Sequence, residues 1–339
     1  MNLLKQNVGV DISKDSFVAT FAIMLQGQII ENKRTRNFRN TTKGIAEFIE
    51  WVNKLKNPAL DLHVTMEATG VYYEELAYTL CELDNIIVHV LLPNIAKKYF
   101  ESLNVKIKTD KVDSKILGQM GLERFLKPWV LSSKIYRNLR TLSREKGQLV
   151  KESTMVKNQL HAETHTAEPL KRTITRFKNR IKYLAKQIKS IEQDIDKVLA
   201  SDNFVSDKVK KIETVPGIST ATIVGIIAET GGFVNIKSIK QLTSYSGYDV
   251  SIQESGKWKG KSSISKKGNS HIRRLMHMPT LSSIRSSKNH KSTYNRIIEN
   301  KEYKMIGVVA MQRKLLGLIY TLWKNDSEYI EDYQKNKTA

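Results

Sequence analysis

The order of apolar segments in the first 125 residues restricts the possible fold more than any other feature of this sequence. Three segments within residues 7–36 (NVGVDIS, SFVATFAIM and GQIIENKRTRNF) are rich in β-branched and aromatic residues and are separated by short polar turns. They predict three consecutive strands. Thr41 and Thr42 then precede a segment to Leu55 in which apolar residues recur at helical spacing, so we expect a helix there.

Strand and helix segments alternate after this helix. DLHVTMEATG predicts a buried strand that ends at Gly70, and IIVHVLL predicts another strand. VYYEELAYTLCEL, NIAKKYFESL and the segment around Asp113 predict helices. Three leading strands followed by alternating elements are typical of a mixed sheet with helices on both faces. We therefore expect an α/β domain in this part of the chain.

Four acidic residues occupy notable places in this domain. Asp11 and Glu67 each follow an apolar strand segment, and ligands of open α/β sheets bind where strands end. Asp110 and Asp113 are three residues apart, which places them on one face of a helix. Four such carboxylates could hold two hard divalent ions such as Mg²⁺, which prefers oxygen ligands and can act in pairs on a phosphodiester.

Each of these acids also has a purely structural interpretation. Asp11 fits a turn, Glu67 fits a solvated strand end, and Asp110 fits a helix N-cap with Asp113 in the first turn. The order of the strands is the one that an RNase H-like nuclease needs, and this favours the joint site. The residues alone leave both interpretations open.

The charge of the chain favours a polyanionic partner. Lys and Arg number 56 against 34 Asp and Glu, giving a formal net charge of +22. Such a surplus is typical of proteins that bind nucleic acid, although a ribosome-like or membrane-surface protein would share it. The sequence has no run of 18 apolar residues and no signal-peptide core at its start, so we expect no membrane association. A single cysteine, Cys81, fits a reducing cytoplasm.

Residues 131–200 contain almost no Gly or Pro and read as long helices. One apolar seam at steps of three and four is clean, and an earlier seam is weaker because Lys146 and Ser153 interrupt it. The clean seam runs through Ile174, Phe177, Ile181, Leu184, Ile188, Ile191, Ile195 and Val198. An antiparallel hairpin and a dimerising coiled coil both fit, and we favour self-association. Arg137, Arg140, Arg144 and Lys151 predict a basic face on the first helix.

Residues 208–330 predict further helices and a basic loop. VPGIST between two helical segments resembles half of a helix-hairpin-helix, in which backbone N–H groups near Gly217 grip a phosphate; an ordinary Pro-Gly turn fits equally. The stretch KWKGKSSISKKGNSHIRR predicts nucleic-acid contacts, although a solvated basic loop fits its charge. The candidate residues are Lys257, Trp258, Lys259, Lys261, Lys266, Lys267, Arg273 and Arg274.

Several motifs resemble one known family. GVDISKDSF, MEATGVYYEEL and KTDKVDSKILGQ resemble the N-terminal domain of the DEDD transposases of insertion sequences, the family guided by a bridge RNA. VPGISTATIVGIIAETGGF and ESGKWKGKSSISKKGNSHIRRLM resemble its C-terminal domain. The sequence departs from the family pattern at VPGIST and at SYSGYDV, which puts the local loop shape in doubt more than the activity.

The resemblance implies a fold and a division into domains. Residues 1–130 would form a RuvC-like RNase H-fold domain, residues 131–205 a helical coiled-coil oligomerisation region, and residues 206–339 a mostly helical transposase domain with a helix-hairpin-helix-like element. The tetrad Asp11, Glu67, Asp110 and Asp113 would bind Mg²⁺. Ser255, in QESGK, would be the nucleophile. Without the resemblance, Ser255 is one of several loop serines beside Ser246, Ser262 and Ser263.

The resulting functional hypothesis is a DNA transposase or recombinase. The enzyme would cleave and rejoin phosphodiesters of donor and target DNA, with a bridge RNA as guide and a dimer or tetramer as the active assembly. Two alternatives remain: an RNase H-like junction-resolving nuclease without serine chemistry, and a non-catalytic basic nucleic-acid-binding protein. Formation of a covalent link between DNA and protein separates the first from both others.

Overall fold

The computed structural model describes residues 2–252, 254–256, 258–260 and 262–331. The chain forms two compact units, residues 1–131 and residues 132–339. The helical middle region belongs to the second of these units. A further division into separate middle and C-terminal domains stays a prediction.

The first unit is built on a five-stranded mixed sheet, which confirms the expected α/β class. The strand order is β3-β2-β1-β4-β5, in which β1, β2 and β3 are antiparallel and β1, β4 and β5 are parallel. The strands are β1 (Leu3–Ile12), β2 (Ser16–Leu25), β3 (Ile29–Arg39), β4 (Leu62–Glu67) and β5 (Ile86–Leu91). Strand β4 thus ends at Glu67, three residues before the expected Gly70.

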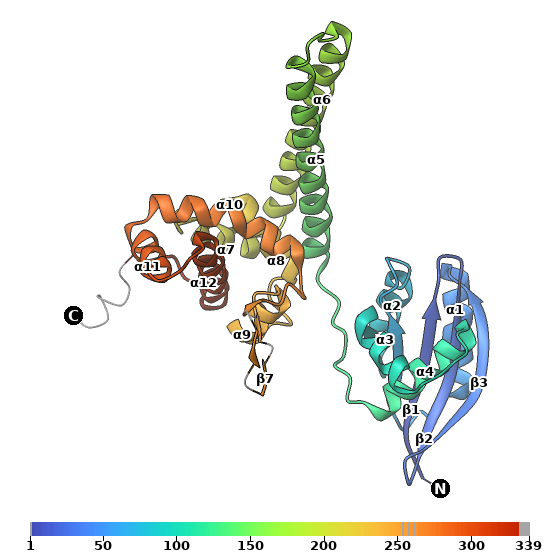
Figure 1. Ribbon diagram of the computed structural model, residues 1–339. Coiled ribbons are helices and arrows are strands. Elements are labelled where there is room, and N and C mark those ends of the chain that lie inside the picture. The colour runs from blue at the N-terminus through green and yellow to red at the C-terminus, as the bar shows by residue number, and fades with distance from the viewer. Residues whose placement is uncertain (1, 253, 257, 261, 332–339) are drawn as a thin grey trace. The chain divides into compact units, whose positions relative to one another are not determined.

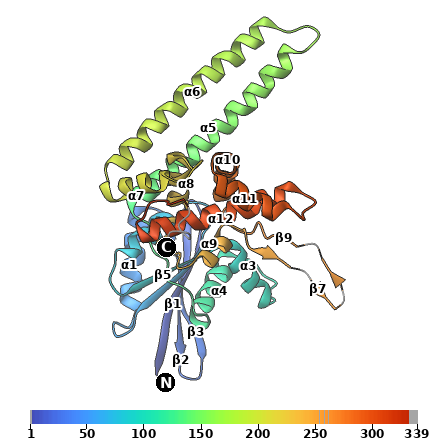
Figure 2. The same ribbon diagram turned by 90° about the vertical axis from the view of Figure 1, so that its left-hand side faces the viewer.

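Helices cover both faces of this sheet (Figure 2). One face packs on α1 and α2 through the larger apolar core, which contains Val8, Val10, Phe48 and Leu80. The other face carries α4, and a smaller core joins α4 to α3. The helices are α1 (Thr42–Leu55), α2 (Glu74–Cys81), α3 (Pro93–Ser102) and α4 (Asp110–Glu123).

Helix α4 packs unusually close to the sheet because small residues meet there. A side chain at Gly9 of β1 would clash with the backbone of Ser114 and Gly118 in α4. Polar contacts then fix the helix: Asn7 Nδ2 donates to the Gly118 carbonyl at 2.7 Å, and the hydroxyls of Thr20 and Ser114 lie 2.8 Å apart. The start of α4 therefore packs directly on the sheet, with no large side chains between the two backbones.

The second unit begins with a long antiparallel hairpin of α5 (Lys134–Thr164) and α6 (Lys171–Ala200), clearly visible in Figure 1. The two residues that interrupt the weaker seam are accommodated inside it. Lys146 Nζ reaches across to Glu192 Oε1 at 2.8 Å, and Ser153 is small enough to be buried between the helices. The plain hairpin interpretation is thus correct, and self-association through this region stays a prediction.

The rest of the second unit is a helical body with short strands. Its core is formed by residues from α5 to α12, among them Leu139, Ile227 and Trp323. The helices are α7 (Asn203–Glu213), α8 (Thr220–Thr230), α9 (Ile239–Tyr245), α10 (Ser270–Ser286), α11 (Lys288–Ile298) and α12 (Lys304–Asn325). Among the described residues α12 is the one helix long and apolar enough to cross a membrane, but it packs in this core against α7, α9, α10 and α11.

Four two-residue strands, which the sequence did not predict, lie between α9 and α10. Strand β6 (Val250–Ser251) pairs with β9 (Ser263–Ile264), and β7 (Glu254–Ser255) pairs with β8 (Trp258–Lys259). Residues 250–264, as far as they are described, form a narrow ribbon that projects from the helical body (Figures 1 and 2). We call it the serine ribbon.

Candidate active site

Asp11 and Glu67 lie side by side at the carboxyl ends of two parallel strands. Val10 of β1 is level with Met66 of β4, so the next residues in each strand are Asp11 and Glu67. Side chains alternate between the faces of a strand, and Asp11 therefore shares the face of Gly9, the face against which α4 packs. The β-sheet thus aims both carboxylates toward the start of α4.

Asp110 and Asp113 occupy the first turn of α4, but neither is its N-cap. The cap is Thr109, whose hydroxyl accepts a hydrogen bond from the Val112 N–H at 3.3 Å. The interpretation of Asp110 as the cap is therefore wrong, because a threonine one residue earlier already satisfies that backbone group. The two aspartates remain in the first turn, where the helix dipole favours negative charge, and both are turned to the same cavity.

This cavity has a volume of about 720 Å³ and lies entirely within the first unit. All four predicted acids line it, so the structure brings together the tetrad that the sequence proposed. Two lysines, Lys97 and Lys108, also line it, and the exposed apolar residues Val105 and Ile107 form part of its rim. Neither lysine was predicted from the sequence. For Lys108 the available signal was the segment KIKTDK, in which lysines lie on both sides of Asp110.

Burial and neighbouring carboxylates raise the pKa of Asp11, Glu67 and Asp113. Burial first, then the charges of Asp113, Asp110 and Glu67, raise the pKa of Asp11 to about 6. Burial likewise raises the pKa of Glu67 and of Asp113, while Lys108 acts in the opposite direction on both. Several negative charges are thus held together with Lys108 as partial compensation, an arrangement typical of sites that receive a cation.

The donor set fits a hard divalent cation such as Mg²⁺. All four side chains offer carboxylate oxygens, and the cavity is large enough to admit water beside an ion. Within the described residues, however, no three Asp, Glu, His or Cys side chains are already gathered tightly enough to hold one ion. The carboxylates share a cavity in this structure, and ion binding would require their side chains to draw together.

Ser255 lies on the serine ribbon of the second unit. It is exposed and pairs with Trp258 across the tight turn at Gly256, whose backbone is left-handed (φ +59°). Apart from its chain neighbours, no described atom lies within 4 Å of the position that a Gly256 side chain would occupy, so the space beside Ser255 is open. Ser246, by contrast, is buried and donates to the Leu242 carbonyl at 2.7 Å, which makes it unsuited to attack a substrate.

The predicted nucleic-acid contacts fall into three groups. Trp258, Lys266 and Lys267 are exposed and available. Arg273 instead donates to the carbonyls of Ser246 and Gly268 and so supports the base of the ribbon. Arg274 lies against Gly147 of α5. Lys257, Lys261 and the side chain of Lys259 lie outside the described residues.

Close packing against α10 requires glycine at position 217. Its backbone is left-handed (φ +81°), and a side chain there would clash with the backbone of Ser283 in α10. Close approach between the turn and α10 therefore explains this residue without a ligand. A phosphate contact by the neighbouring N–H groups stays a prediction.

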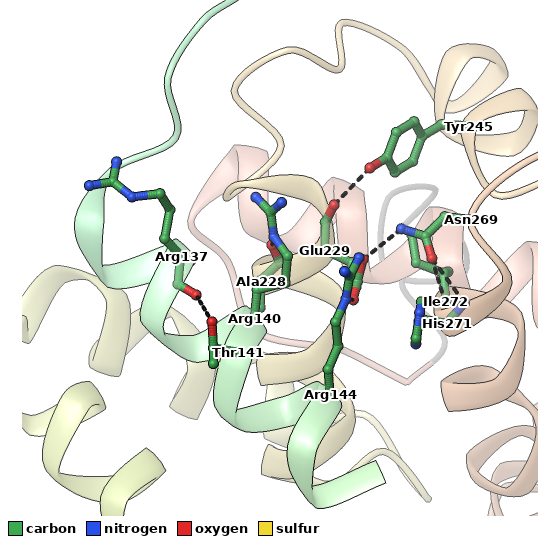
Figure 3. Close-up of polar contacts among 10 residues, drawn as sticks. All are labelled: Arg137, Arg140, Thr141, Arg144, Ala228, Glu229, Tyr245, Asn269, His271 and Ile272. Carbon is green, nitrogen blue, oxygen red and sulfur yellow. Dashed lines mark hydrogen bonds and ion pairs between the residues drawn. The ribbon is translucent and has the colours of Figure 1, made fainter. Parts of the chain in front are cut away.

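A partly buried polar network, which the sequence did not predict, joins α5 to α8 and to the N-cap of α10 (Figure 3). Arg144 Nε and Nη2 donate to the two oxygens of Glu229 at 2.7 and 2.9 Å. Asn269 Nδ2 donates to Glu229 Oε2 at 2.7 Å. Arg144 thus has a partner inside the unit, as does Arg140, whose Nε donates to the Ala228 carbonyl, and a basic face on α5 stays a prediction.

Comparisons with known proteins identify the family of this chain. Residues 8–169 match the family model of the IS110-type DEDD transposases, and residues 209–295 match the model described as transposase IS116/IS110/IS902 family. The chain is also similar to the pilin gene-inverting proteins of Moraxella bovis and Moraxella lacunata, each 24% identical over 334 residues. These alignments cover 96% of this chain and 98% of each relative. The chain therefore belongs to the IS116/IS110/IS902 family of transposases.

Proposed function

We propose that this transposase cleaves and rejoins DNA with a divalent metal ion held by Asp11, Glu67, Asp110 and Asp113, and with Ser255 as the nucleophile. One observation carries the proposal: four carboxylates that are distant in sequence line one cavity in the first unit. Structural roles as turn, cap or strand-end residues would not require them to meet. The names of the relatives, which invert a pilin gene, support a reaction that rejoins the strands it cuts.

The metal is Mg²⁺ in this proposal, and its part is that of a Lewis acid. Once bound, it would polarise a phosphodiester and stabilise the charge that develops on it. The chain supplies the carboxylates that hold the ion, and Lys108 lies at the same cavity to offset phosphate charge. The open, exposed position of Ser255 suits a hydroxyl that must reach a DNA strand.

The serine step conserves the number of phosphoester bonds. The bond between Ser255 Oγ and phosphorus forms as the bond from phosphorus to one DNA strand breaks, and the released strand end takes up a proton to balance the one that the serine loses. Attack by a new strand end reverses these changes and rejoins the DNA. A nuclease that uses water would leave no covalent link, so the two chemistries are experimentally distinct.

The proposed partners are donor DNA, target DNA, a bridge RNA and further copies of this chain, as a dimer or tetramer in the cytoplasm. The excess of Lys and Arg suits two nucleic acids, and the protruding α5–α6 hairpin offers a surface for self-association. In such an assembly the cavity of one copy and the serine ribbon of another would together form the complete site.

A suicide DNA substrate tests the chemistry. With Mg²⁺ we expect wild-type protein to retain labelled DNA after denaturation, and Ser255→Ala to retain none. The neighbouring Ser263→Ala, also on the serine ribbon, serves as the matched control and should retain it. Metal-dependent nicking without an adduct would establish the water-dependent nuclease instead. If Asp11→Ala and Asp113→Ala alter neither cleavage nor metal binding, the acids are structural.

A further inference from the structure

The base of the serine ribbon is held by backbone contacts next to Asn269. Ser265 N donates to the Asp249 carbonyl at 2.7 Å, and Lys266 N donates to the Gly247 carbonyl at 3.1 Å. A side chain at Gly268 would clash with the backbone of Tyr245 and Gly247, and one at Gly247 would crowd Arg273 and the backbone of Lys266. The segments that enter and leave the ribbon are therefore locked together immediately before α10 begins.

Asn269 connects this base to the rest of the unit in three directions. Its side-chain oxygen caps α10 by accepting from the N–H groups of His271 and Ile272, at 2.9 and 3.3 Å. Its backbone N–H donates to the Tyr245 carbonyl at 2.8 Å. Its amide nitrogen donates to Glu229, as described above. Any shift of Asn269 would thus be transmitted to the ribbon base and to the start of α10.

Glu229 is a buried carboxylate with an anchored position. Its side chain is only 2% exposed, whereas that of its partner Arg144 is 46% exposed. Its own backbone carbonyl accepts from the Tyr245 hydroxyl at 2.9 Å. Burial alone would raise the pKa of Glu229, but hydrogen bonds from Arg144 and Asn269 lower it below the ordinary value, which keeps the carboxylate charged. A charged group so placed is costly unless all its partners stay in position.

We propose that Glu229 is a positioning residue for Ser255, because its contacts with Arg144 and Asn269 fix the base of the serine ribbon to helix α5. This inference rests on the proposed role of Ser255. Through these contacts the α5–α6 hairpin would act in positioning as well as in self-association, since a partner that binds α5 would also set the orientation of Ser255. Arg274 of α10 lies against Gly147 of α5 and supplies a second contact between α10 and α5.

One substitution isolates the contact between Glu229 and Asn269. Asn269→Asp keeps the oxygen that caps α10, since Asp and Asn are equally good caps, but it turns a carboxylate toward Glu229 in place of a donor. The double variant Asn269→Asp/Glu229→Gln restores a donor–acceptor pair between these two residues with the roles reversed, and the remaining amide oxygen still accepts from Arg144 Nε although Arg144 Nη2 loses its acceptor. Ser270→Asp adds the same charge at the neighbouring exposed position without facing Glu229, and so serves as the matched control.

The position of the ribbon is measured independently of activity. In a Cys81→Ser background, spin labels at the exposed positions Gln148→Cys on α5 and Glu254→Cys on the ribbon report one distance, with unlabelled protein added to suppress distances between copies. We expect a narrow distribution in the otherwise unchanged protein and with Ser270→Asp. Asn269→Asp should broaden and shift it, and the double variant should restore it.

The chemical readout is the DNA–protein adduct at saturating DNA, measured well below the melting temperature of each variant. We expect Asn269→Asp to lower its rate of formation about tenfold or more, since small misplacements of a reacting group are costly. The double variant should recover part of this loss, since the contact with Asn269 is restored while one of the two bonds from Arg144 is not. An unchanged distance distribution in Asn269→Asp, an equal effect of Ser270→Asp, or a double variant that recovers nothing would overturn the inference. Absence of any adduct in wild-type protein would count against the role of Ser255, while the distance measurement would still decide whether Glu229 fixes the ribbon.

Discussion

Asp11 and Glu229 are carboxylates in opposite electrostatic surroundings. Burial first, then repulsion from Asp113, Asp110 and Glu67, raises the pKa of Asp11. Glu229 is the opposite case, a buried carboxylate whose donors lower its pKa. Both are costly to bury unpaired, and Glu229 finds its partners within the chain, whereas Asp11 lies among like charges.

Asp11→Asn should stabilise the metal-free protein. A carboxyl pKa that rises from 3.8 to about 6 on folding means that stability falls as pH rises through this interval and stays reduced above it. After allowance for solvent screening of this partly exposed group, we expect a gain of about 1 kcal/mol at pH 7. Differential scanning calorimetry measures it, and the variant should also lose the increase in melting temperature that Mg²⁺ gives to the wild type.

Asp15→Asn is the control for this substitution, since Asp15 is exposed and does not line the cavity. It should change neither the melting temperature nor the response to Mg²⁺. An equal stabilisation by both substitutions would show that the effect of Asp11 reflects net charge and not the cavity.

A pair of histidines should make the first unit sensitive to acid. His63 Nδ1 and His89 Nε2 lie 2.9 Å apart, and His89 Nδ1 lies 3.0 Å from the Lys127 carbonyl, to which it must donate. His89 Nε2 is then the acceptor and His63 the donor. Burial first, then Lys5 and His89, lower the pKa of His63 to about 4, against the raising effect of Asp61; burial also lowers the pKa of His89.

The sign of the pH effect follows from these shifts. Between pH 6.5 and about 4 the unfolded chain binds more protons at His63 than the folded chain does, so stability should fall as pH falls through this interval. With allowance for partial exposure we expect His63→Leu to reduce the loss between pH 7 and pH 4.5 by about 1 kcal/mol. Urea unfolding at the two pH values measures it. The exposed His161→Leu should leave the loss unchanged, and a wild-type-like loss in His63→Leu would refute the assignment.

At the scale of elements, the close approach of α4 to the sheet is what assembles the tetrad. Gly9→Ala should push α4 away, because the added methyl group would clash with the backbone of Ser114 and Gly118. We expect a loss of about 2–3 kcal/mol in stability, together with loss of Mg²⁺ binding, as the start of α4 carries Asp110 and Asp113. Chemical denaturation and calorimetric titration with Mg²⁺ measure the two effects.

Gly118→Ala offers the matched control at the same interface. Its added methyl group would meet its nearest neighbours at 3.5–3.7 Å, which is ordinary contact, and alanine favours helix over glycine by about 1 kcal/mol. This variant should keep wild-type stability or gain slightly, and it should bind Mg²⁺. If both alanine variants behaved alike, close packing of α4 would not be the feature that assembles the cavity.

For the whole molecule, the important variable is the length of free chain between the two units. The linker after α4 is anchored to the first unit at Trp129. The Trp129 N–H donates to the Val88 carbonyl at 2.7 Å, and the Trp129 indole stacks on Tyr78. With this anchor in place, only residues 130–133 remain before α5, and they span at most about 14 Å. Release of Trp129 would leave Lys127 held, because its carbonyl accepts from His89 Nδ1, and would free residues 128–133, which span up to about 21 Å.

Trp129→Ala should therefore release the linker. Loss of the partly buried indole costs about 2 kcal/mol, which corresponds to about 30-fold more of the released form. Phe125 is 97% exposed and lies four residues before Trp129, so chymotrypsin cleavage after it should accelerate as the chain that follows it loosens. Adding Phe125→Ser should remove the cleavage, and an unchanged cleavage rate in Trp129→Ala would show that the indole does not anchor the linker.

The sequence by itself determined the elements of the first unit and the identity of the acids. Apolar runs rich in β-branched residues predicted β1 and β2, and helical spacing predicted α1 and the hairpin. Strand ends and helix spacing, together with the motif resemblance, pointed to the tetrad, and the resemblance alone pointed to Ser255. These features depend on local periodicity and residue type, which are visible along one stretch of chain. The error at Asp110 was local as well, since Thr109 competed for the same cap.

Only the tertiary structure decided which distant groups meet. It placed Lys97 and Lys108 in the acidic cavity, paired Arg144 with Glu229, and gave Gly9 and Gly217 their reason in close packing. It also produced the four short strands around Ser255, which are too brief to leave a pattern in the sequence. Such contacts depend on the register of the sheet and the approach of helices across it, and neither is encoded in the spacing of nearby residues.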